Sequence, residues 1–269
     1  MEEHVSPFTI IKAQAKNEVP IIINVPHAGV WFPPEDQRLF KAEITQHPPD
    51  TDWFVDQLYD FAPSMGASLM KANISRYVID LNRPSNGQSL YQDGRSTPGL
   101  LPQQTFQGQD IYQEVVDVHS LKTKRISLYY EPYYEKLEAL IQQKKERFGC
   151  CLLIDAHSIK RRVPSVRAEA FADIILGNNL GQSCDAKIID LAQEILSSHY
   201  QVKVNEPFQG GHITRSFARP KEGIHCLQIE MSQDLYLDES NDSLIAKHQE
   251  LKQHLTELTQ ALATVIREI

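Results

Sequence analysis

The sequence of 269 residues has no run of about 20 apolar residues, which is the length that a transmembrane helix needs. Its N-terminus, MEEHVSPFTI, is acidic and has no apolar core of the kind found in secretory signal peptides. We therefore expect no membrane-spanning segment and no membrane partner. A cytoplasmic location is the default expectation.

Positive charge is also scarce. The chain has 27 Lys and Arg residues against 35 Asp and Glu residues, so its formal net charge is −8. Its isoelectric point is about 5.7. Because nucleic acids and anionic membranes attract basic surfaces, this balance argues against either as the main partner. A local basic pocket is still compatible with it.

Cysteine is rare, and its spacing excludes one class of metal site. The four cysteines are Cys150, Cys151, Cys184 and Cys226, with no CxxC motif, so a zinc site built from cysteines is not expected. We expect reduced, mostly buried thiols, with the adjacent Cys150 and Cys151 on opposite faces of a strand. Linkers, repeats and low-complexity segments are also missing, which favours one domain over residues 1–269.

Apolar runs and amphipathic segments alternate along the chain. The apolar runs predict strands at 20–25, 76–81, 151–155 and 224–231, with further strands at 68–72, 173–177 and 201–205. Amphipathic periodicity and terminal capping residues predict helices at 50–66, 129–149, 185–200 and 243–269. This alternation is typical of an α/β fold with a central, mostly parallel (mixed) sheet flanked by helices. The long polar loop at 84–108 is of a kind that is usually functional or disordered.

Polar, chemically able side chains stand near the end of each of the four main predicted strands. They are His27; Asp80, Asn82 and Arg83; Asp155, His157 and Ser158; and Glu230. Each group alone has an ordinary structural explanation, such as a turn or an ion pair. Ligands of open α/β sheets bind outside the carboxyl ends of the strands. Four such endings therefore predict an active site at one edge of the sheet.

The residue types favour a catalytic zinc site. Two histidines and one carboxylate, with a fourth position left for water, form a common site of this class. His27 and His157 come from separate strands, and we expect Asp52 of the segment PPDTDW to be the third ligand. Asp50 is the alternative, although it also suits the N-cap of the predicted helix. The residues leave zinc, manganese and cobalt open.

Two carboxylates are candidates for the proton chemistry. Glu230 lies in an apolar strand, where a carboxylate is costly unless it is paired or functional. It is either a buried partner of an arginine or the general base that moves a proton from water to a leaving amine. Asp155 lies two residues before His157 and is expected to accept the second ring N–H of a ligand histidine.

The arginines predict an acidic substrate. Arg76, Arg83 and Arg215 lie beside strand ends or glycines in a chain that is acidic overall, and a guanidinium matches the geometry of a carboxylate. In the segment PFQGGHITRS, His212 and Arg215 follow two glycines that permit close approach or a hinge, although an ordinary surface turn also fits. We expect a small dicarboxylate.

A set of motifs carries a resemblance to a known family. In this order, NVPHAG, DTDW, SRYVIDLNR, TFQGQDIY, LIDAHSI, NEPFQGGHITR and LQIEMS resemble the N-formylglutamate amidohydrolase (deformylase) family over about residues 20–235. That family resembles zinc-dependent exopeptidases in fold, and DLNR is also similar to the aspartoacylase branch. The resemblance implies His27, Asp52 and His157 as metal ligands and Glu230 as general base.

The same resemblance implies a carboxylate site and an activity. Asn82 and Arg83 are the implied carboxylate ligands, and the implied reaction is cleavage of N-formyl-L-glutamate to formate and L-glutamate, in histidine degradation. The chain has Tyr134 where the family is expected to have histidine, and it is unusually basic after residue 159. Both departures affect the expected acyl group more than the metal site.

Three alternatives remain at this point. In the first, the chain is a deacylase of another N-acyl acidic amino acid or of a peptide. In the second, it is a non-catalytic protein that binds acidic amino acids. A serine hydrolase built on Ser158 is disfavoured because no G-x-S-x-G motif surrounds that residue.

Overall fold

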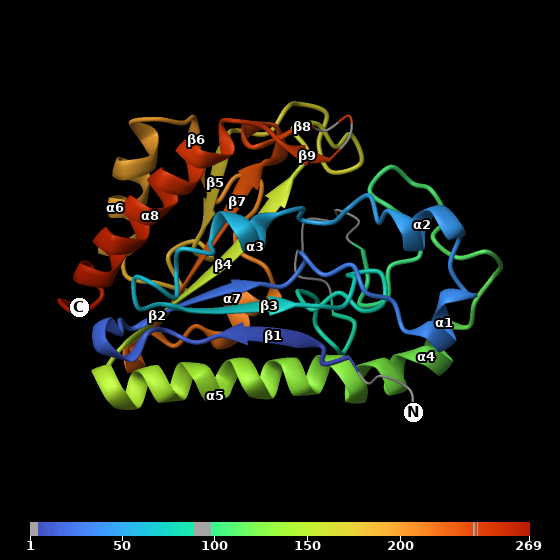
Figure 1. The fold of residues 1–269 in the computed structure, drawn as a ribbon, viewed down its shortest axis with the longest axis horizontal. Helices are drawn as coiled ribbons and strands as arrows, with labels where there is room; N and C mark the ends of the chain where they lie inside the picture. Colours follow the sequence, from blue (N-terminus) through green and yellow to red (C-terminus); the bar gives the residue numbers. More distant parts are fainter. Residues whose placement is uncertain (1–4, 89–97, 239, 241) are drawn as a thin grey trace.

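A mixed sheet forms the centre of this computed structural model, which describes residues 5–88, 98–238, 240 and 242–269. Within these residues the sheet has seven strands (Figure 1). Their order across the sheet is β1 (Phe8–Ile11), β3 (Ser68–Ala72), β2 (Ile21–Val25), β4 (Cys151–Ile159), β7 (Ile224–Ser232), β5 (Ile174–Gly177) and β6 (Val202–Val204). A separate small hairpin pairs β8 (Leu237–Asp238) with β9 (Ser243–Leu244).

The four central strands, β3, β2, β4 and β7, run parallel to one another. The remaining strands make the sheet mixed, because β1 pairs antiparallel with β3, and β5 pairs antiparallel with β7. The predicted fold class, a central and mostly parallel sheet between helices, is confirmed. Parallel carboxyl ends at the centre of the sheet also provide the edge at which the site was expected.

Helices cover both faces of the sheet. The helices of the described residues are α1 (Pro34–Gln37), α2 (Ala42–Gln46), α3 (Val55–Leu58), α4 (Val118–Arg125), α5 (Glu131–Phe148), α6 (Ala186–Ser197), α7 (His212–Phe217) and α8 (His248–Val265), of which α1 and α2 lie beyond the end of the sheet (Figure 1). Three of the predicted helices are confirmed as α5, α6 and α8. The first of them begins earlier than predicted, because α4 and a π-helical turn at Ile126–Tyr130 lead directly into α5. None of the described helices combines the length and the apolar character needed to cross a membrane.

The central strands are buried on both sides, as their unbroken apolar runs predict. Along β2, Ile21, Ile23 and Val25 pack into a core with α3, α6 and α8. Ile22 points to the opposite face and packs with α5. Figure 1 shows α5 along one side of the sheet and α6 with α8 along the other. All four cysteines are free, and all but the half-buried Cys150 are buried.

One predicted strand is wrong. Residues 76–81 form turns, in which the amide of Val78 donates to the carbonyl of Ser75 and the amide of Asp80 donates to the carbonyl of Leu100. Their apolar side chains are buried against the α5 side of the sheet. Residues 76–81 therefore have the apolar pattern of a strand although they are not in the sheet. The pattern depends on which side chains are buried and not on how the backbone is hydrogen-bonded.

The predicted helix at 50–66 is also mostly wrong. Only Val55–Leu58 forms α3, and Phe54 before it has a left-handed backbone with φ of 59°. A helix cannot run through such a residue. Asp50 is consequently not a helix cap. Its side chain accepts hydrogen bonds from the hydroxyl of Tyr77, at 2.7 Å, and from the amide of Phe106, at 2.8 Å.

The polar loop expected at 84–108 is described only in part. Residues 89–97 lie outside the described residues. The part from residue 98 onward borders the cavity that is presented below.

Candidate functional site

Three buried side chains meet beyond the carboxyl ends of the central strands. One ligand atom each from His27, Asp52 and His157 lies within 4.8 Å of the others. His27 follows the end of β2 and His157 lies in the neighbouring β4. The amide of Asp52 donates to the carbonyl of His27 at 3.1 Å, so the backbone itself brings the carboxylate to the first histidine.

Each histidine turns its Nδ1 atom toward Asp52 and its Nε2 atom toward another carboxylate. The Nδ1 atoms of His157 and His27 lie 3.1 Å and 3.7 Å from Asp52 Oδ2. On the far side of the rings, His27 Nε2 lies 2.8 Å from Asp80 Oδ1, and His157 Nε2 lies 3.3 Å from Asp155 Oδ1. Ligand histidines are usually held by a carboxylate in this way. The donor set of two imidazoles and one carboxylate therefore fits a divalent cation such as zinc.

Asp80 is held from three directions. Besides His27, it accepts from the guanidinium of Arg76 at 2.9 Å and from the amide of Asn82 at 2.9 Å. Burial alone raises the pKa of Asp80, but the charges around it, including His27 and Arg76, hold that pKa well below its ordinary value. Burial and the charge of Arg76 lower the pKa of His27. The sequence singled out Asp80 as a strand-end residue without giving it this role.

Apart from His157, the partners of Asp155 are neutral. Its Oδ1 accepts from the amide of Asn24 at 3.0 Å, and its Oδ2 accepts from the hydroxyl of Thr214 at 3.0 Å. The hydroxyl of Tyr133, on α5, donates to Asn24 Oδ1 at 2.6 Å and so extends this buried chain of hydrogen bonds across the sheet. Burial lowers the pKa of His157, but the carboxylates of Asp155 and Asp52 raise it well above its ordinary value.

Glu230 lies next to the cluster because of the strand register. It occupies β7 directly opposite His157 of β4, and its side chain is close to fully buried, at 8% exposure. Burial, opposed by the charge of His157 and reinforced by that of Asp52, raises the pKa of Glu230 to about 8. Among the described residues, no arginine forms an ion pair with Glu230; its carboxylate accepts from the amide of Gln228 at 3.2 Å.

A cavity of about 230 Å³ opens onto these side chains. Seven of the residues expected from the sequence line it: His27, Asp52, Arg76, Asn82, Arg83, His157 and Glu230. The sequence did not single out Gln228, Phe106 and Phe208, which line it as well. Of the other expected residues, Asp155 lies behind His157, while His212 and Arg215 belong to α7 and are not part of the lining.

The two arginines of the cavity differ in what they contact. Arg76 donates to Asp80 and to the carbonyl of Asp50, at 3.2 Å, so its charge is compensated by a buried carboxylate. Arg83 donates to the carbonyls of Pro98, at 2.9 Å, and Asn82, at 3.0 Å. Because carbonyl oxygens carry no net charge, Arg83 is the better placed of the two to attract an anion.

Asn82 is fixed above His157 by a close backbone approach. Its Oδ1 accepts from the amide of Ile213 at 2.8 Å, and its Nδ2 lies 3.0 Å from His157 Nε2. A Cβ atom at Gly211 would come within 2.3 Å of this Nδ2 atom, so only glycine fits there. Gly211 of the glycine pair thus allows the backbone to come close to the side chain of Asn82.

His212 lies at the start of α7, close to two arginines. Burial, together with the charges of Arg83 and Arg215, lowers the pKa of His212 to about 4. Its imidazole is therefore neutral at pH 7 and adds no charge beside the cavity.

Comparison with known proteins gives a consistent set of relatives. The sequence model of the N-formylglutamate amidohydrolase family matches residues 19–237. An N-formylglutamate deformylase of Pseudomonas aeruginosa is 35% identical over 258 residues, which cover 94% of this chain and 92% of the relative. A second N-formylglutamate deformylase, of Pseudomonas putida, is 36% identical over 228 residues, which cover 84% of each chain.

Solved structures agree with the sequence relatives. The crystal structure of an N-formylglutamate amidohydrolase from Ralstonia eutropha JMP134 superposes with a TM-score of 0.84 and 25% sequence identity. The match covers 98% of this chain and 99% of that one. The similarity therefore includes the sheet and the segments that hold the cavity residues.

Proposed function

The chain belongs to the N-formylglutamate amidohydrolase family, and from this premise we propose that it hydrolyses N-formyl-L-glutamate to formate and L-glutamate with the help of a divalent metal ion. The observation that carries the proposal is the buried cluster of His27, Asp52 and His157 beside Glu230, inside a cavity that Arg83 also lines. A metal-ligand set, a base and an anion-binding group are the parts that this reaction requires.

The metal ligands in this proposal are His27, Asp52 and His157, with Asp80 and Asp155 holding the two imidazoles. A cation bound there supplies Lewis acidity to the formyl carbonyl, lowers the pKa of the attacking water and, by its charge, lowers the pKa of Glu230. Zinc is the ion that this donor set suits best, with manganese and cobalt as alternatives.

Glu230 is the proposed general base. Its carboxylate faces the same cavity as the ligand cluster, and the amide of Gln228 holds one of its oxygens. It accepts a proton from the water that attacks the formyl carbon and delivers that proton to the departing amine of glutamate. The buried setting keeps bulk water from competing for the proton.

The substrate carboxylates are the proposed partners of the arginines. Arg83 binds a carboxylate of the substrate directly, with Asn82 beside it. Arg76 lines the cavity beside Arg83, although its charge is shared with Asp80, and Arg215 adds positive charge from α7 outside the lining. His212, which is neutral, offers that carboxylate a ring N–H and no charge. Two anchored carboxylates hold the amide carbon at a fixed place relative to Glu230.

Three further parts of the proposal are carried over from the sequence. The role in histidine degradation rests on the resemblance to the family, whereas the cytoplasmic location and the single catalytic domain over residues 1–269 rest on the composition of the chain.

The test uses the purified full-length chain. Metal content is measured by elemental analysis, and formate release is assayed on N-formyl-L-glutamate. Glu230→Gln keeps the size of the side chain but cannot accept the proton, so we expect full metal content and a turnover about 10²–10⁴-fold lower. Glu146→Gln, an exposed position on α5, is the matched control and should keep wild-type turnover.

Each other outcome selects an alternative. If formate release is slower than deacylation of another N-acyl amino acid, that amino acid would be the substrate instead. Tight binding of glutamate without any turnover would make the chain a binding protein. A metal-replete Glu230→Gln enzyme with normal turnover would remove Glu230 from the reaction.

A further inference from the structure

The segment from Gln103 to Ile111 folds as a small hairpin with Phe106 at its tip. The amide of Ile111 donates to the carbonyl of Gln103, and the amide of Thr105 donates to the carbonyl of Gln109, both at 2.9 Å. These backbone bonds, with an antiparallel bridge between the two arms, give Phe106 a defined position.

Phe106 is fastened to the wall of the cavity at several points. Its amide donates to the carboxylate of Asp50 at 2.8 Å, and its carbonyl accepts from the hydroxyl of Ser165. Its ring lies against the guanidinium of Arg76, 4.9 Å from the ring centre to the guanidinium carbon. The ring also packs on a small apolar cluster that contains Ile159 and Val163. These contacts hold the half-buried ring in place between its neighbours.

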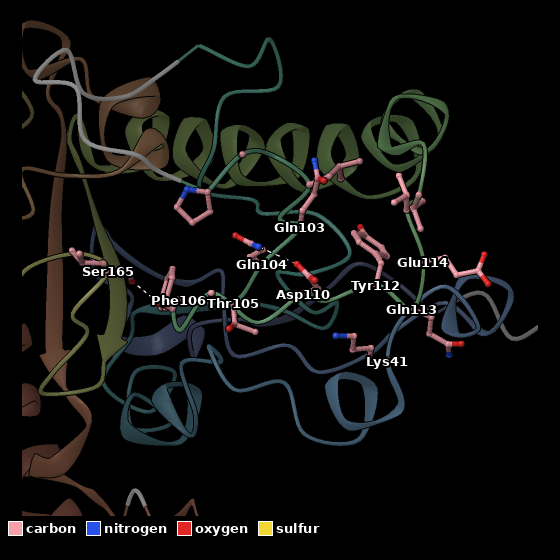
Figure 2. Close-up of a pocket in the computed structure, with 17 residues that line it drawn as sticks. Lys41, Gln103, Gln104, Thr105, Phe106, Asp110, Tyr112, Gln113, Glu114 and Ser165 are labelled. Carbon is pink, nitrogen blue, oxygen red and sulfur yellow. Dashed lines mark hydrogen bonds between the residues drawn. The ribbon is translucent and has the colours of Figure 1, made fainter.

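A larger groove lies on the other side of Phe106. It has a volume of about 910 Å³, and Figure 2 shows it with Phe106 and Ser165 at one end and Gln113 and Glu114 at the other. The residues that line both this outer groove and the inner cavity are Pro98, Phe106, Ser165 and Val166. These four residues therefore border both spaces, and the ring of Phe106 is the largest of their side chains.

The lining of the inner cavity has a polar part and an apolar part. Arg83 and Asn82 are neighbours in the polar part, where the substrate carboxylate is proposed to bind. Phe106 and Ile159 pack together in the apolar part. When the carboxylates are anchored by arginine and the carbonyl lies at the ligand cluster, the acyl substituent is left to face apolar side chains.

We propose that Phe106 determines which acyl groups the enzyme accepts: its ring closes the inner cavity and restricts the reaction to the smallest N-acyl substituents. Replacing the ring by a small side chain joins the cavity to the outer groove and admits longer acyl chains. The chemistry is unchanged, since water adds to the acyl carbon, the C–N bond breaks and the amine takes the proton. This inference rests on the proposed function.

The experiment measures selectivity rather than activity alone. Wild type, Phe106→Leu and Phe106→Ala are assayed with N-formyl-, N-acetyl- and N-butyryl-L-glutamate, and kcat/KM for each longer substrate is divided by that for the formyl substrate. One extra methylene in a tight pocket changes kcat/KM by about 10–200-fold. We therefore expect the butyryl-to-formyl ratio to rise at least about tenfold in Phe106→Ala and by an intermediate amount in Phe106→Leu.

Gln103→Ala is the control, because Gln103 lines the outer groove but not the inner cavity, and its ratio should equal that of wild type. The ratio is insensitive to a general loss of activity through Arg76, since such a loss divides out. An unchanged ratio in both folded Phe106 variants would overturn this inference alone. A wild-type enzyme that does not release formate from N-formyl-L-glutamate would overturn the proposed function and this inference with it.

Discussion

His27 and His157 each turn one ring nitrogen toward Asp52 and the other toward a second carboxylate, but the two supporting carboxylates lie in different kinds of structure. Asp155 is part of β4, at the centre of the sheet. Asp80 lies in a turn that follows residue 75 and lies outside the sheet. The same geometry is thus built twice in one site by different means.

The chemical support differs in the same way. Asp155 is held by the neutral groups of Asn24 and Thr214, whereas Asp80 is held by the cation of Arg76. Inside the sheet, the register of the strands already places the carboxylate, so neutral hydrogen bonds are sufficient to orient it. In the turn, single backbone hydrogen bonds such as that of Asp80 to Leu100 replace the strand ladder, and a buried ion pair orients the carboxylate. For these two carboxylates, the position inside or outside the sheet thus decides whether neutral hydrogen bonds or an ion pair must hold them.

The largest effect is expected for the two ligand histidines, which the two sides have in common. His27→Ala and His157→Ala should both lose bound metal and hydrolysis, because each removes one of three ligands. We expect the loss of metal affinity to exceed the 10–100-fold that removal of a supporting residue typically costs. Elemental analysis and formate release measure the two effects. His119→Ala, at an exposed histidine of α4, should keep its metal, and full metal retention in either site variant would contradict the ligand assignment.

The next effect should separate the two sides. Asp80→Asn and Asp155→Asn should each weaken metal binding by about 10–100-fold. In the metal-free protein, Asp80→Asn should lose about 3–5 kcal/mol of unfolding free energy, because it leaves the buried cation of Arg76 without its partner. Asp155→Asn should lose only about 1–3 kcal/mol, since its other partners are neutral and His157, unlike an arginine, can release its proton and still faces Asp52. Urea unfolding in the presence of a chelator measures both.

A double substitution sharpens this comparison. Adding Arg76→Met to Asp80→Asn removes the unpaired charge and should recover part of the lost stability without restoring metal affinity. Equal stability losses in the two single variants would mean that the ion pair does not distinguish the two sides.

The smallest effect is expected at the far end of the neutral chain. Tyr133→Phe removes the hydroxyl that donates to Asn24 and should cost about 1 kcal/mol. It should also weaken metal binding, by less than the roughly tenfold loss expected when a carboxylate that contacts a ligand histidine is replaced. Tyr134→Phe is its control on the same helix, because it loses a hydrogen bond to the carbonyl of Leu81 but is not part of the chain through Asn24 and Asp155. Metal titration of both variants decides whether the chain beyond Asp155 affects the site.

Much of the fold was predictable from local pattern. The apolar run of β2 and the amphipathic helices α5, α6 and α8 were predicted close to their observed positions. The predictions failed at residues 76–81 and 50–66, where buried side chains belong to turns. Hydrophobic periodicity reports which side chains are covered, and it cannot tell whether a strand ladder or a packed loop covers them.

The candidate site shows the same division. The side chains with suitable chemistry were named from their types and from their places after apolar runs. Which of them meet was decided elsewhere: His27 and Asp80 are 53 residues apart, and Asp52 and His157 are 105 residues apart. Asp80 changed from an unassigned strand-end residue to the support of a ligand histidine only when the turn placed it there.

The sequence by itself determined the residue types, the alternation of strands and helices and the lack of a CxxC motif, because these depend on neighbouring residues along the chain. The tertiary structure alone decided that Arg76 faces Asp80, that Asn82 lies against Gly211 and that Phe106 lines two cavities. Such contacts depend on the register of strands and the path of loops, which arise from many weak interactions summed over the whole chain. No short stretch of sequence contains that sum.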